Sequence, residues 1–416
     1  MLSPIKMLSE ISGCLGDLAT LIPILVSLSK FGQTSLSASL VFGGIFNILT
    51  GVIYDIPMCV QPMKAIAAQA LASHLNQKEI GSAGLFVSSI VLLLGVTNLI
   101  QVVNQKIPLS IIRGIQLGAG LTLITKGIDT IMKSHQFEFV DLRWMDNFLV
   151  AFLAFVFTIY FNRSEFNPTA LVLFGIALIF AGVQLNSTKQ GSLVFGTSFP
   201  APSSLVPSGR EFANGVLSAG LGQLPLTLLN SVIATSKLAD DLYPDRVRPV
   251  ASVRSVSICV GLMNLLGVWF GSMPFCHGSG GLAAQYRFGA RSGVSMYVLG
   301  SLKIVLGLTL GSSLVLLIQY LPNSILGMML CIAGLELSLC ARDLGPKLTV
   351  NQNSDDELAD KYLIMLATAS SIIGFKNDGI GFVVGCLTAF LIRIQRHGVS
   401  SLVIRSDRKD AVDETC

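Results

Sequence analysis

Long apolar runs alternate with short polar segments along the whole chain. A helix of about 20 residues crosses the hydrocarbon core of a bilayer. Runs near this length lie at 11–28, 36–54, 80–103, 108–124, 148–161, 169–185, 212–231, 256–270, 294–319, 325–340, 362–375 and 379–394. The polar segment 126–146 is predicted as a loop. The pattern indicates an all-α polytopic membrane protein.

A segment rich in Ser, Pro and Gly, 187–210, divides the chain and predicts a linker. It separates residues 1–186 from residues 211–395, with a short cytoplasmic tail at 396–416. Each half holds seven predicted membrane elements when one additional, interrupted segment per half is counted. An odd number of crossings makes two such halves insert in opposite directions.

The two interrupted segments resemble each other. Pro57–Gln69 and Pro274–Gln285 both open with Pro-x-Cys and close with an aliphatic residue followed by Ala-Ala-Gln. Proline and glycine oppose helix in the first part of each segment, and alanine favours it in the second. Within a bilayer this pattern predicts a broken helix whose new N-terminus points its free N–H groups at a cavity.

The first spans of the halves also correspond at one constant offset, with Gly13, Leu15 and Pro23 matching Gly215, Leu217 and Pro225. The predicted fold is therefore a 7+7 inverted-repeat transporter with two broken half-helices. In such folds the binding site lies near the membrane midplane, where the repeats meet.

Composition agrees with this class and excludes others. Mean hydropathy is +0.69 and only 12% of residues are charged, whereas soluble domains carry about 25%. The net charge of +4 comes mostly from loops, so it indicates membrane orientation and predicts no nucleic-acid partner. With both termini in the cytoplasm, basic loop residues are concentrated inside, as the positive-inside rule requires.

Neither a leader nor a cysteine-based site is expected. The first ten residues are short and lead into an apolar run that is followed by further spans, so this run is predicted to be a transmembrane helix and not a cleaved signal peptide. The eight cysteines show no paired spacing, so no disulfide framework, metal site or cofactor is predicted.

The broken helices carry the candidate binding residues. A helix N-terminus is a ready anion site, and two of them facing each other would suit a compact oxyanion. The candidates are Gln61 and Lys64 in the first segment and His277, Gly278, Ser279, Gly280 and Gly281 in the second. Gln223, Thr227 and Thr20 lie near prolines of the matching first spans and are expected to line the cavity.

Structural interpretations of these residues remain open at this point. Lys64 could extend to the membrane surface or pair with Asp55 or Asp17. Asp17 and Glu336 could join helices by hydrogen bonds. His277 could be a satisfied polar residue, and the glycines could serve close helix packing.

Three stretches resemble the eukaryotic molybdate transporter family, a branch of the sulfate permease superfamily. They are Glu10–Pro23, Asp55–Ala68 and Phe270–Gly293, and the likeness covers most of the chain. The resemblance implies a fold divided into core and gate domains, molybdate as substrate, and a possible homodimer. Carried over, the first motif falls on Gln61, Pro62 and Lys64, and the second on residues 276–281, beginning with Cys276.

The resemblance also bears on the end of the chain. Many sulfate permeases end in a large soluble regulatory domain, and residues 396–416 are too few to form one. The molybdate branch is similarly short, which favours it over sulfate.

The predicted function is secondary active transport of molybdate by alternating access. Moving a dianion inward against 100 mV costs roughly twice 2.3 kcal/mol, so proton coupling is expected. Asp17, Asp55, His277 and Glu336 are the candidate proton carriers. The protein is expected in the plasma membrane or the vacuolar membrane, with the lipid bilayer as its surroundings.

Several alternatives stay open. A sulfate or broader oxyanion carrier would share the fold, because the two anions differ mainly in size. A passive anion channel could share it as well. A nucleobase carrier would need carboxylates in the second broken helix. An intramembrane aspartyl protease would need Asp17 and Asp55 as paired acids, although the glycine spacing and motif order argue against this.

Overall fold

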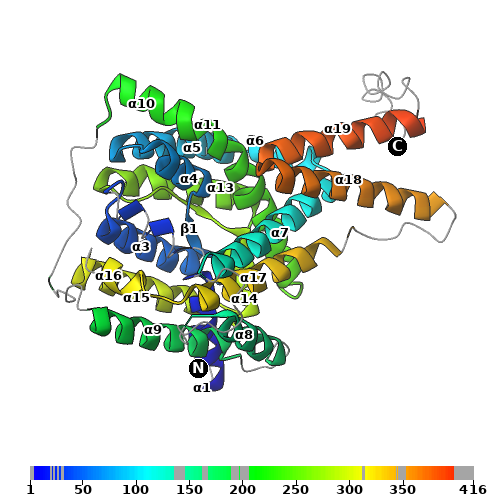
Figure 1. The fold of residues 1–416 in the computed structure, drawn as a ribbon. Coiled ribbons are helices and arrows are strands. Elements are labelled where there is room, and N and C mark those ends of the chain that lie inside the picture. Colours follow the sequence, from blue (N-terminus) through cyan, green and yellow to red (C-terminus); the bar gives the residue numbers. More distant parts are fainter. Residues whose placement is uncertain are drawn as a thin grey trace.

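The computed structural model shows an assembly of helices (Figure 1). It describes residues 4–18, 21, 24–25, 28–29, 32–134, 146–161, 167–188, 196, 206–311, 314–342, 344 and 353–397.

The first half follows the predicted order of apolar segments. Its elements are α1 (Pro4–Cys14), η1 (Leu15–Asp17), α3 (Leu36–Tyr54), β1 (Val60–Pro62), α4 (Lys64–Ser73), α5 (Gln77–Val96), α6 (Leu99–Lys106), α7 (Leu109–Ser134), α8 (Phe148–Tyr160) and α9 (Thr169–Thr188). The helix α3 has the bounds predicted from the sequence. Of the remainder of the predicted first span, the described residues 18, 21, 24–25 and 28–29 are helical.

The second half begins with one continuous helical stretch from Gly209 to Leu242, in which α-helical and π-helical segments alternate. Its elements are α10 (Gly209–Gly215), η2 (Val216–Gly220), α11 (Leu221–Leu226), η3 (Thr227–Ala234), α12 (Thr235–Leu242), α13 (Val253–Gly267), η4 (Val268–Phe270), β2 (Phe275–His277), α14 (Ser279–Arg287), α15 (Val294–Thr309), α16 (Leu314–Ile318), α17 (Asn323–Leu339), η6 (Cys340–Arg342), α18 (Asn353–Phe375) and α19 (Asp378–His397).

The helices are those of a multi-pass membrane protein. Seven helices of the described residues are long and apolar enough to cross a membrane, or eight if the bent pair α6–α7 counts as one span. Apolar α8, α15 and α17 are shorter, and α4 and α14 are half-helices. Many large apolar side chains on the outer helix faces are exposed, including Leu387 and Leu391 on α19, as expected for a surface that faces lipid.

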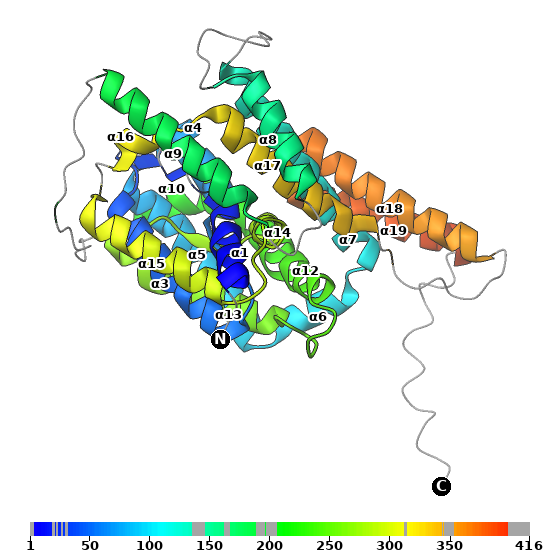
Figure 2. The same ribbon diagram turned by 90° about the horizontal axis from the view of Figure 1, so that it is seen from below.

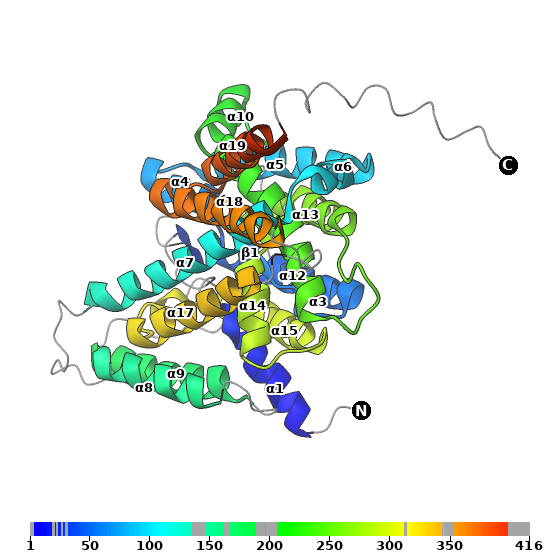
Figure 3. The same cartoon turned by 90° about the vertical axis from the view of Figure 1, so that its right-hand side faces the viewer.

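The packing is exchanged between the two halves. α3 packs along α15, and α13, the second-half counterpart of α3, packs along α5. α7 packs along its own counterpart, α17. In Figures 2 and 3, α18 and α19 lie together, away from α3 and α15. β1 and α14 lie near the middle of the molecule. Each helix of these pairs thus meets a partner from the other half.

Glycines permit these close helix contacts. A methyl group built on Gly44 of α3 would lie 2.5 Å from the carbonyl oxygen of Gly300 on α15, and one on Gly300 would lie 2.5 Å from the carbonyl oxygen of Gly44. Likewise, a methyl group on Gly120 of α7 would lie 2.7 Å from the carbonyl oxygen of Gly334 on α17, and one on Gly334 would lie 2.5 Å from that of Gly120. Small residues that let helix backbones approach are typical of packing within membranes.

Three sequence predictions are wrong in detail. The predicted span 80–103 is two helices, because Asn98 takes a left-handed φ of 63° after α5 ends. The predicted span 294–319 is interrupted in the same way, where Gly311 takes a φ of 51° between α15 and α16. Residues 126–134, predicted as loop, continue α7, since Ile128 and Ile131 extend its apolar spacing.

Candidate functional site

A short antiparallel ribbon joins the two broken helices. β1 pairs with β2 so that Val60 lies opposite His277, Gln61 opposite Cys276, and Pro62 opposite Phe275. Residues before prolines favour extended backbone, and both segments carry prolines here. No strand was predicted, because three-residue strands leave no periodic pattern; β1 and β2 are the only strands in the described ranges.

Two buried asparagines hold the ribbon from either side. Asn47 of α3 accepts the N–H of Val60 through Oδ1 at 2.9 Å. Asn264 of α13 accepts the N–H of Phe275 and donates to its carbonyl oxygen. α3 and α13 are counterparts in the two halves, so the same device occurs twice. Sequence reasoning missed both residues, although the same offset separates Asn47 from Asn264 and Pro57 from Pro274.

Each half-helix starts directly after its strand. α4 begins at Lys64 after Met63, and α14 begins at Ser279 after Gly278, and neither preceding residue caps the helix with its side chain. For α4 the acceptor comes from the other half: Oε1 of Gln223 on α11 accepts the N–H groups of Ala65 at 2.8 Å and Ile66 at 3.3 Å. The first turn of α4 therefore presents N–H donors toward α11.

Gln223 is itself held in position. Its side chain is fully buried, and its Nε2 donates to Oγ1 of Thr227 at 2.9 Å. Both residues were predicted to line the cavity; Gln223 lies at the start of α4, and Thr227 bonds to Gln223. The other residue of that prediction, Thr20, lies outside the described residues.

Gln61 lies between the two halves of the site. Its Nε2 donates to Oδ1 of Asp17 on η1. The backbone of α14 passes so close that a methyl group on Gly278 would lie 2.0 Å from Oε1 of Gln61, and one on Gly281 would lie 2.2 Å from Sγ of Cys59. Only glycine fits at these two positions without a shift of the neighbours.

His277 is sealed in the interior. Its side chain is fully buried, its Nδ1 lies 3.1 Å from the carbonyl oxygen of Cys59, and the ring of Tyr54 meets it edge-on. Its Nε2 has no hydrogen-bond partner among the described residues. Cys59 in turn donates from Sγ to the carbonyl oxygen of Gly278.

The N-terminus of α14 faces two other helices. Oγ of Ser279 donates to Oδ1 of Asn230 on η3, a partner that sequence reasoning missed. A methyl group on Gly280 would lie 2.7 Å from Cδ1 of Leu123 on α7. The predicted residues of the second motif thus lie in one buried cluster with Gln61, and Pro62 and Cys276 lie in the ribbon beneath it.

Lys64 stands apart from the acids proposed as its partners. It is half-buried in the first turn of α4 and forms no ion pair within 4 Å in the part of the chain that the structure describes. It interacts electrostatically with Lys126 on α7 and Asp378 on α19. Neither of these residues was predicted to belong to the site.

The other predicted acids belong to different networks. Asp55 is exposed at the end of α3, pairs with Arg246 at 3.3 Å and accepts the N–H of Gly293. Glu336 of α17 lies 3.8 Å from Arg287, the last residue of α14. Because Asp17 bonds to Gln61 and Asp55 to Arg246, the two do not form the acid pair that a protease requires.

A buried lysine was missed altogether. Lys303 of α15 is 3% exposed, and its Nζ has no hydrogen-bond partner among the described residues. It interacts electrostatically with Asp17, Cys59 and Cys14. Lys303 was not singled out because it lies within the predicted membrane span 294–319, whose other residues are mostly apolar.

The comparisons with known proteins agree with this geometry. Residues 9–123 and 215–337 match a family described as molybdate transporter of the MFS superfamily. The chain belongs to this molybdate transporter family. The two matching stretches begin in the first span of each half and contain one broken helix each.

Curated relatives are similar over nearly the whole chain. Molybdate transporter 1 of Arabidopsis thaliana is 37% identical, covering 94% of this chain and 89% of its own length. Molybdate transporter 2 of the same plant is 35% identical, covering 97% and 91%. Molybdate transporter 1 of Chlamydomonas reinhardtii is 32% identical, covering 96% and 94%.

Solved structures show the same fold at low identity. SLC26A9 matches 94% of this molybdate-transporter-family chain with a TM-score of 0.59 and 14% identity, and the chain spans 65% of that protein. The transmembrane domain of the cyanobacterial bicarbonate transporter BicA matches 92% of the chain with a TM-score of 0.53 and 15% identity. The fold is thus the 7+7 inverted repeat that was predicted.

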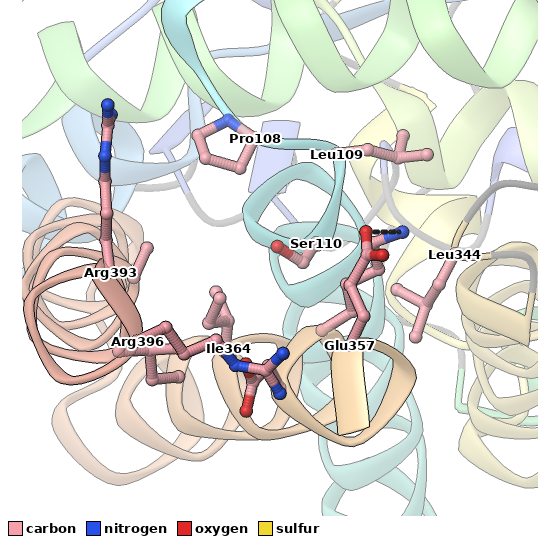
Figure 4. A pocket seen from close by; sticks show the side chains of 12 residues that line it. Pro108, Leu109, Ser110, Leu344, Glu357, Ile364, Arg393 and Arg396 are labelled. Atoms are coloured by element: carbon pink, nitrogen blue, oxygen red, sulfur yellow. Dashed lines mark ion pairs between the residues drawn. The ribbon is translucent and has the colours of Figure 1, made fainter. Parts of the chain in front are cut away.

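A separate hollow of about 630 Å³ lies where α7 begins, against α18 and α19 (Figure 4). None of the predicted site residues lines it. Two of its acids pair with its own basic residues, Glu357 with Lys361 and Asp360 with Arg396. Because its charges are largely balanced internally, it gives no indication of a substrate anion.

Proposed function

We propose that this protein carries molybdate across a membrane by alternating access, with the oxyanion bound at the start of the two half-helices. The names of the relatives support the substrate. The observation that carries the proposal is the antiparallel ribbon β1–β2, which ties the N-terminus of α4 to that of α14. Two such ends offer unpaired N–H donors and partial positive charge to one anion.

The surrounding groups suit a tetrahedral dianion. Lys64 supplies a full positive charge in the first turn of α4, Ser279 supplies a hydroxyl, and Gly278 and Gly281 allow close backbone approach. The N–H groups of Ala65 and Ile66 already bond an amide oxygen, that of Gln223. An oxygen of molybdate would replace it as acceptor when Gln223 turns toward its other partner, Thr227.

Transport of this dianion is proposed to be coupled to protons. Entry of two negative charges against 100 mV costs roughly twice 2.3 kcal/mol, and co-transported protons remove that cost. Asp17, Asp55, His277 and Glu336 are the sequence-derived candidates for the coupling group. A proton-coupled carrier is expected to acidify the compartment that molybdate enters. Molybdate uptake that is insensitive to pH would contradict proton coupling.

The test of substrate and site is uptake of labelled molybdate at nanomolar concentration, with excess sulfate as competitor. Lys64→Ala is expected to reduce uptake by about tenfold to a hundredfold, the range for losing a charged hydrogen-bond donor. Lys106→Ala, at an exposed position on α6, is the matched control and is expected to transport normally. Surface labelling must show equal amounts of each variant in the membrane.

The outcomes separate the rival substrates and mechanisms. Uptake that resists sulfate and is lost in Lys64→Ala supports a molybdate carrier. Uptake abolished by sulfate indicates a broader oxyanion carrier of the same fold. Counterflow separates carrier from channel, because only a carrier accelerates uptake when substrate is loaded on the far side.

We further propose a homodimer in the plasma membrane or the vacuolar membrane. The resemblance to the sulfate permease superfamily supports the dimer, and the exposed apolar face of α19 is compatible with lipid or a second copy. Light scattering of the purified protein in detergent gives the oligomeric state. A fluorescent fusion in plant or algal cells gives the membrane.

A further inference from the structure

Asp378 lies among the cations next to the proposed anion site. It is the first residue of α19, and it interacts electrostatically with Lys64 of α4 and Lys126 of α7. Its Oδ2 is buried and has no hydrogen-bond partner among the described residues. Lys126 interacts with Lys64 and with Asp378, so a carboxylate and two lysines form one electrostatic group from three helices.

Packing places this group at the start of both half-helices. Gly379, the next residue of α19, lies against Pro225 of α11, because a methyl group on the glycine would be 3.3 Å from Cγ of that proline. Two residues before Pro225, Gln223 accepts the first N–H groups of α4. On the other side Leu123, one helical turn before Lys126, touches Gly280 of α14. Asp378 and Lys126 therefore flank the two helix ends.

The other charges near Asp378 are few. Lys376, two residues earlier, interacts with Lys126. The neighbouring α11 and η3 contain no charged residue. The charged residues of α18 lie in its first turns, at the opposite end of the hairpin, where Asp360 pairs with Arg396. On α7, Arg113 pairs with Asp241 and Asp129 is exposed. Asp378 is thus the acid that faces the site lysines.

We propose that Asp378 is the carboxylate whose protonation is linked to binding of the oxyanion. Ionised, it offsets one of the two positive charges of Lys64 and Lys126 and repels a dianion. Protonated by a proton from solution, it leaves both lysine charges for the dianion, so that two positive charges meet two negative ones. Binding of the dianion then favours protonation of Asp378 by the same factor, because linkage is reciprocal.

The three acids and the histidine predicted from the sequence as proton carriers make other contacts, which agrees with this assignment. Asp17 bonds to Gln61, Asp55 to Arg246, and Glu336 lies beside Arg287. His277 is a fully buried residue of the ribbon, and its Nδ1 lies 3.1 Å from the carbonyl oxygen of Cys59.

The inference rests on the proposed function and is tested by calorimetric titration of the purified full chain with molybdate. Titrations at one pH in buffers of different ionisation enthalpy give the number of protons taken up per molybdate bound. We expect about one proton for the wild type and about none for Asp378→Asn, with a dissociation constant that rises by up to about tenfold per pH unit only in the wild type. Asp378→Glu should retain the proton uptake.

Asp129→Asn is the matched control, an exposed acid of α7 three residues beyond Lys126, and should take up protons as the wild type does. Proton uptake that persists in Asp378→Asn, or is absent from the wild type while molybdate binds, would overturn the assignment alone. A wild-type protein that binds no molybdate would overturn the proposed function and the assignment with it. Molybdate binding by Asp378→Asn in the same titration shows that this variant is folded, so that a loss of proton uptake is not due to misfolding.

Discussion

Gly278 leaves room for Gln61 and for nothing larger than hydrogen: a methyl group built on Gly278 would lie 2.0 Å from Oε1 of Gln61. Gly281, one turn later, would place a methyl group 2.4 Å from Nε2 of the same side chain. The amide of Gln61 is thus enclosed by the first turn of α14 while it bonds to Asp17. Gln61, from the segment before α4, thus contacts both the start of α14 and Asp17 of η1.

Gly278→Ala is expected to abolish molybdate uptake while the protein still reaches the membrane. The added methyl group must displace Gln61 or the start of α14, and overpacking of this kind costs about 1–3 kcal/mol. Both shifts disturb the helix end that is proposed to bind the anion. Uptake per surface-labelled molecule and the melting temperature in detergent measure the two effects.

The matched control is Gly175→Ala on α9, where a methyl group meets no atom within 4 Å. Alanine is the better helix former by roughly 0.5–1 kcal/mol, so this variant should melt at the wild-type temperature or above and transport normally. Normal uptake by Gly278→Ala would show that the fit between residue 278 and Gln61 does not matter for transport.

Gln223 allows capping to be separated from anion binding. Gln223→Glu keeps an oxygen for the N–H groups of Ala65 and Ile66 but adds a negative charge where molybdate is proposed to bind. We expect it to fold and melt near the wild type and to bind molybdate at least about tenfold more weakly, because like charges in low dielectric repel by several kcal/mol.

Gln223→Leu is the complementary variant. It removes the acceptor from two N–H groups near the protein interior, and unsatisfied buried donors cost about 1–3 kcal/mol each. Its melting temperature should therefore fall, whereas that of the glutamate variant should not. Equal molybdate affinity of the glutamate variant and the wild type, measured by the same titration, would place the anion elsewhere.

The sequence predicted the architecture well because the pattern that determines it is local. Apolar runs gave α3 with its observed bounds, and Pro-x-Cys followed by an alanine-rich segment gave both half-helices. Equivalent prolines and glycines in the two halves gave the repeat. Each of these signals lies within one stretch of chain, or in two stretches that can be aligned.

The remainder of the site depends on contacts between distant residues, which no local pattern records. Gln223 was predicted to line the cavity, but its role at the start of α4 follows from α11 packing against that helix. Asp378 lies between the predicted spans 362–375 and 379–394 and was not singled out, and Lys126 was assigned to a predicted loop. Lys303 lies within an apolar run. Only the folded helices bring these charges together.

The buried ion pair between α7 and α12 should contribute strongly to stability. Arg113 is 1% exposed and bonds to both carboxylate oxygens of Asp241, and also to Oε1 of Gln116 at 3.0 Å. Asp241→Asn would remove this carboxylate from the buried guanidinium, and breaking a buried ion pair by removing one partner costs about 3–5 kcal/mol. We expect a marked fall in melting temperature.

An exposed pair provides the comparison. Glu357 and Lys361 lie one turn apart on α18 with 3.0 Å between Oε1 and Nζ, and both are partly exposed. Glu357→Gln should change stability by about 0.5 kcal/mol or less. Similar melting temperatures for Asp241→Asn and Glu357→Gln would mean that Gln116 of α7, which accepts from Arg113 and donates to the carbonyl oxygen of Ala234, suffices to hold the two helical stretches together.

The inverted repeat predicts that equivalent glycines in the two halves are equally sensitive to substitution. Gly44 of α3 and Gly261 of α13 are separated by the same offset as Asn47 and Asn264. A methyl group on Gly44 would lie 2.5 Å from the carbonyl oxygen of Gly300, and one on Gly261 would lie 2.5 Å from Cβ of Leu92 on α5. Both contacts join a helix to its partner from the other half.

Gly44→Ala and Gly261→Ala should therefore each destabilise the protein by about 1–3 kcal/mol, seen as similar falls in melting temperature, because each forces two packed helices apart. Gly175→Ala, with open space around it, should show no fall. If one of the two equivalent variants melts at the same temperature as this control, the helix pair at that glycine accommodates an added methyl group. The contact of α3 with α15 and that of α13 with α5 would then be equivalent in position but not in how closely the helices pack.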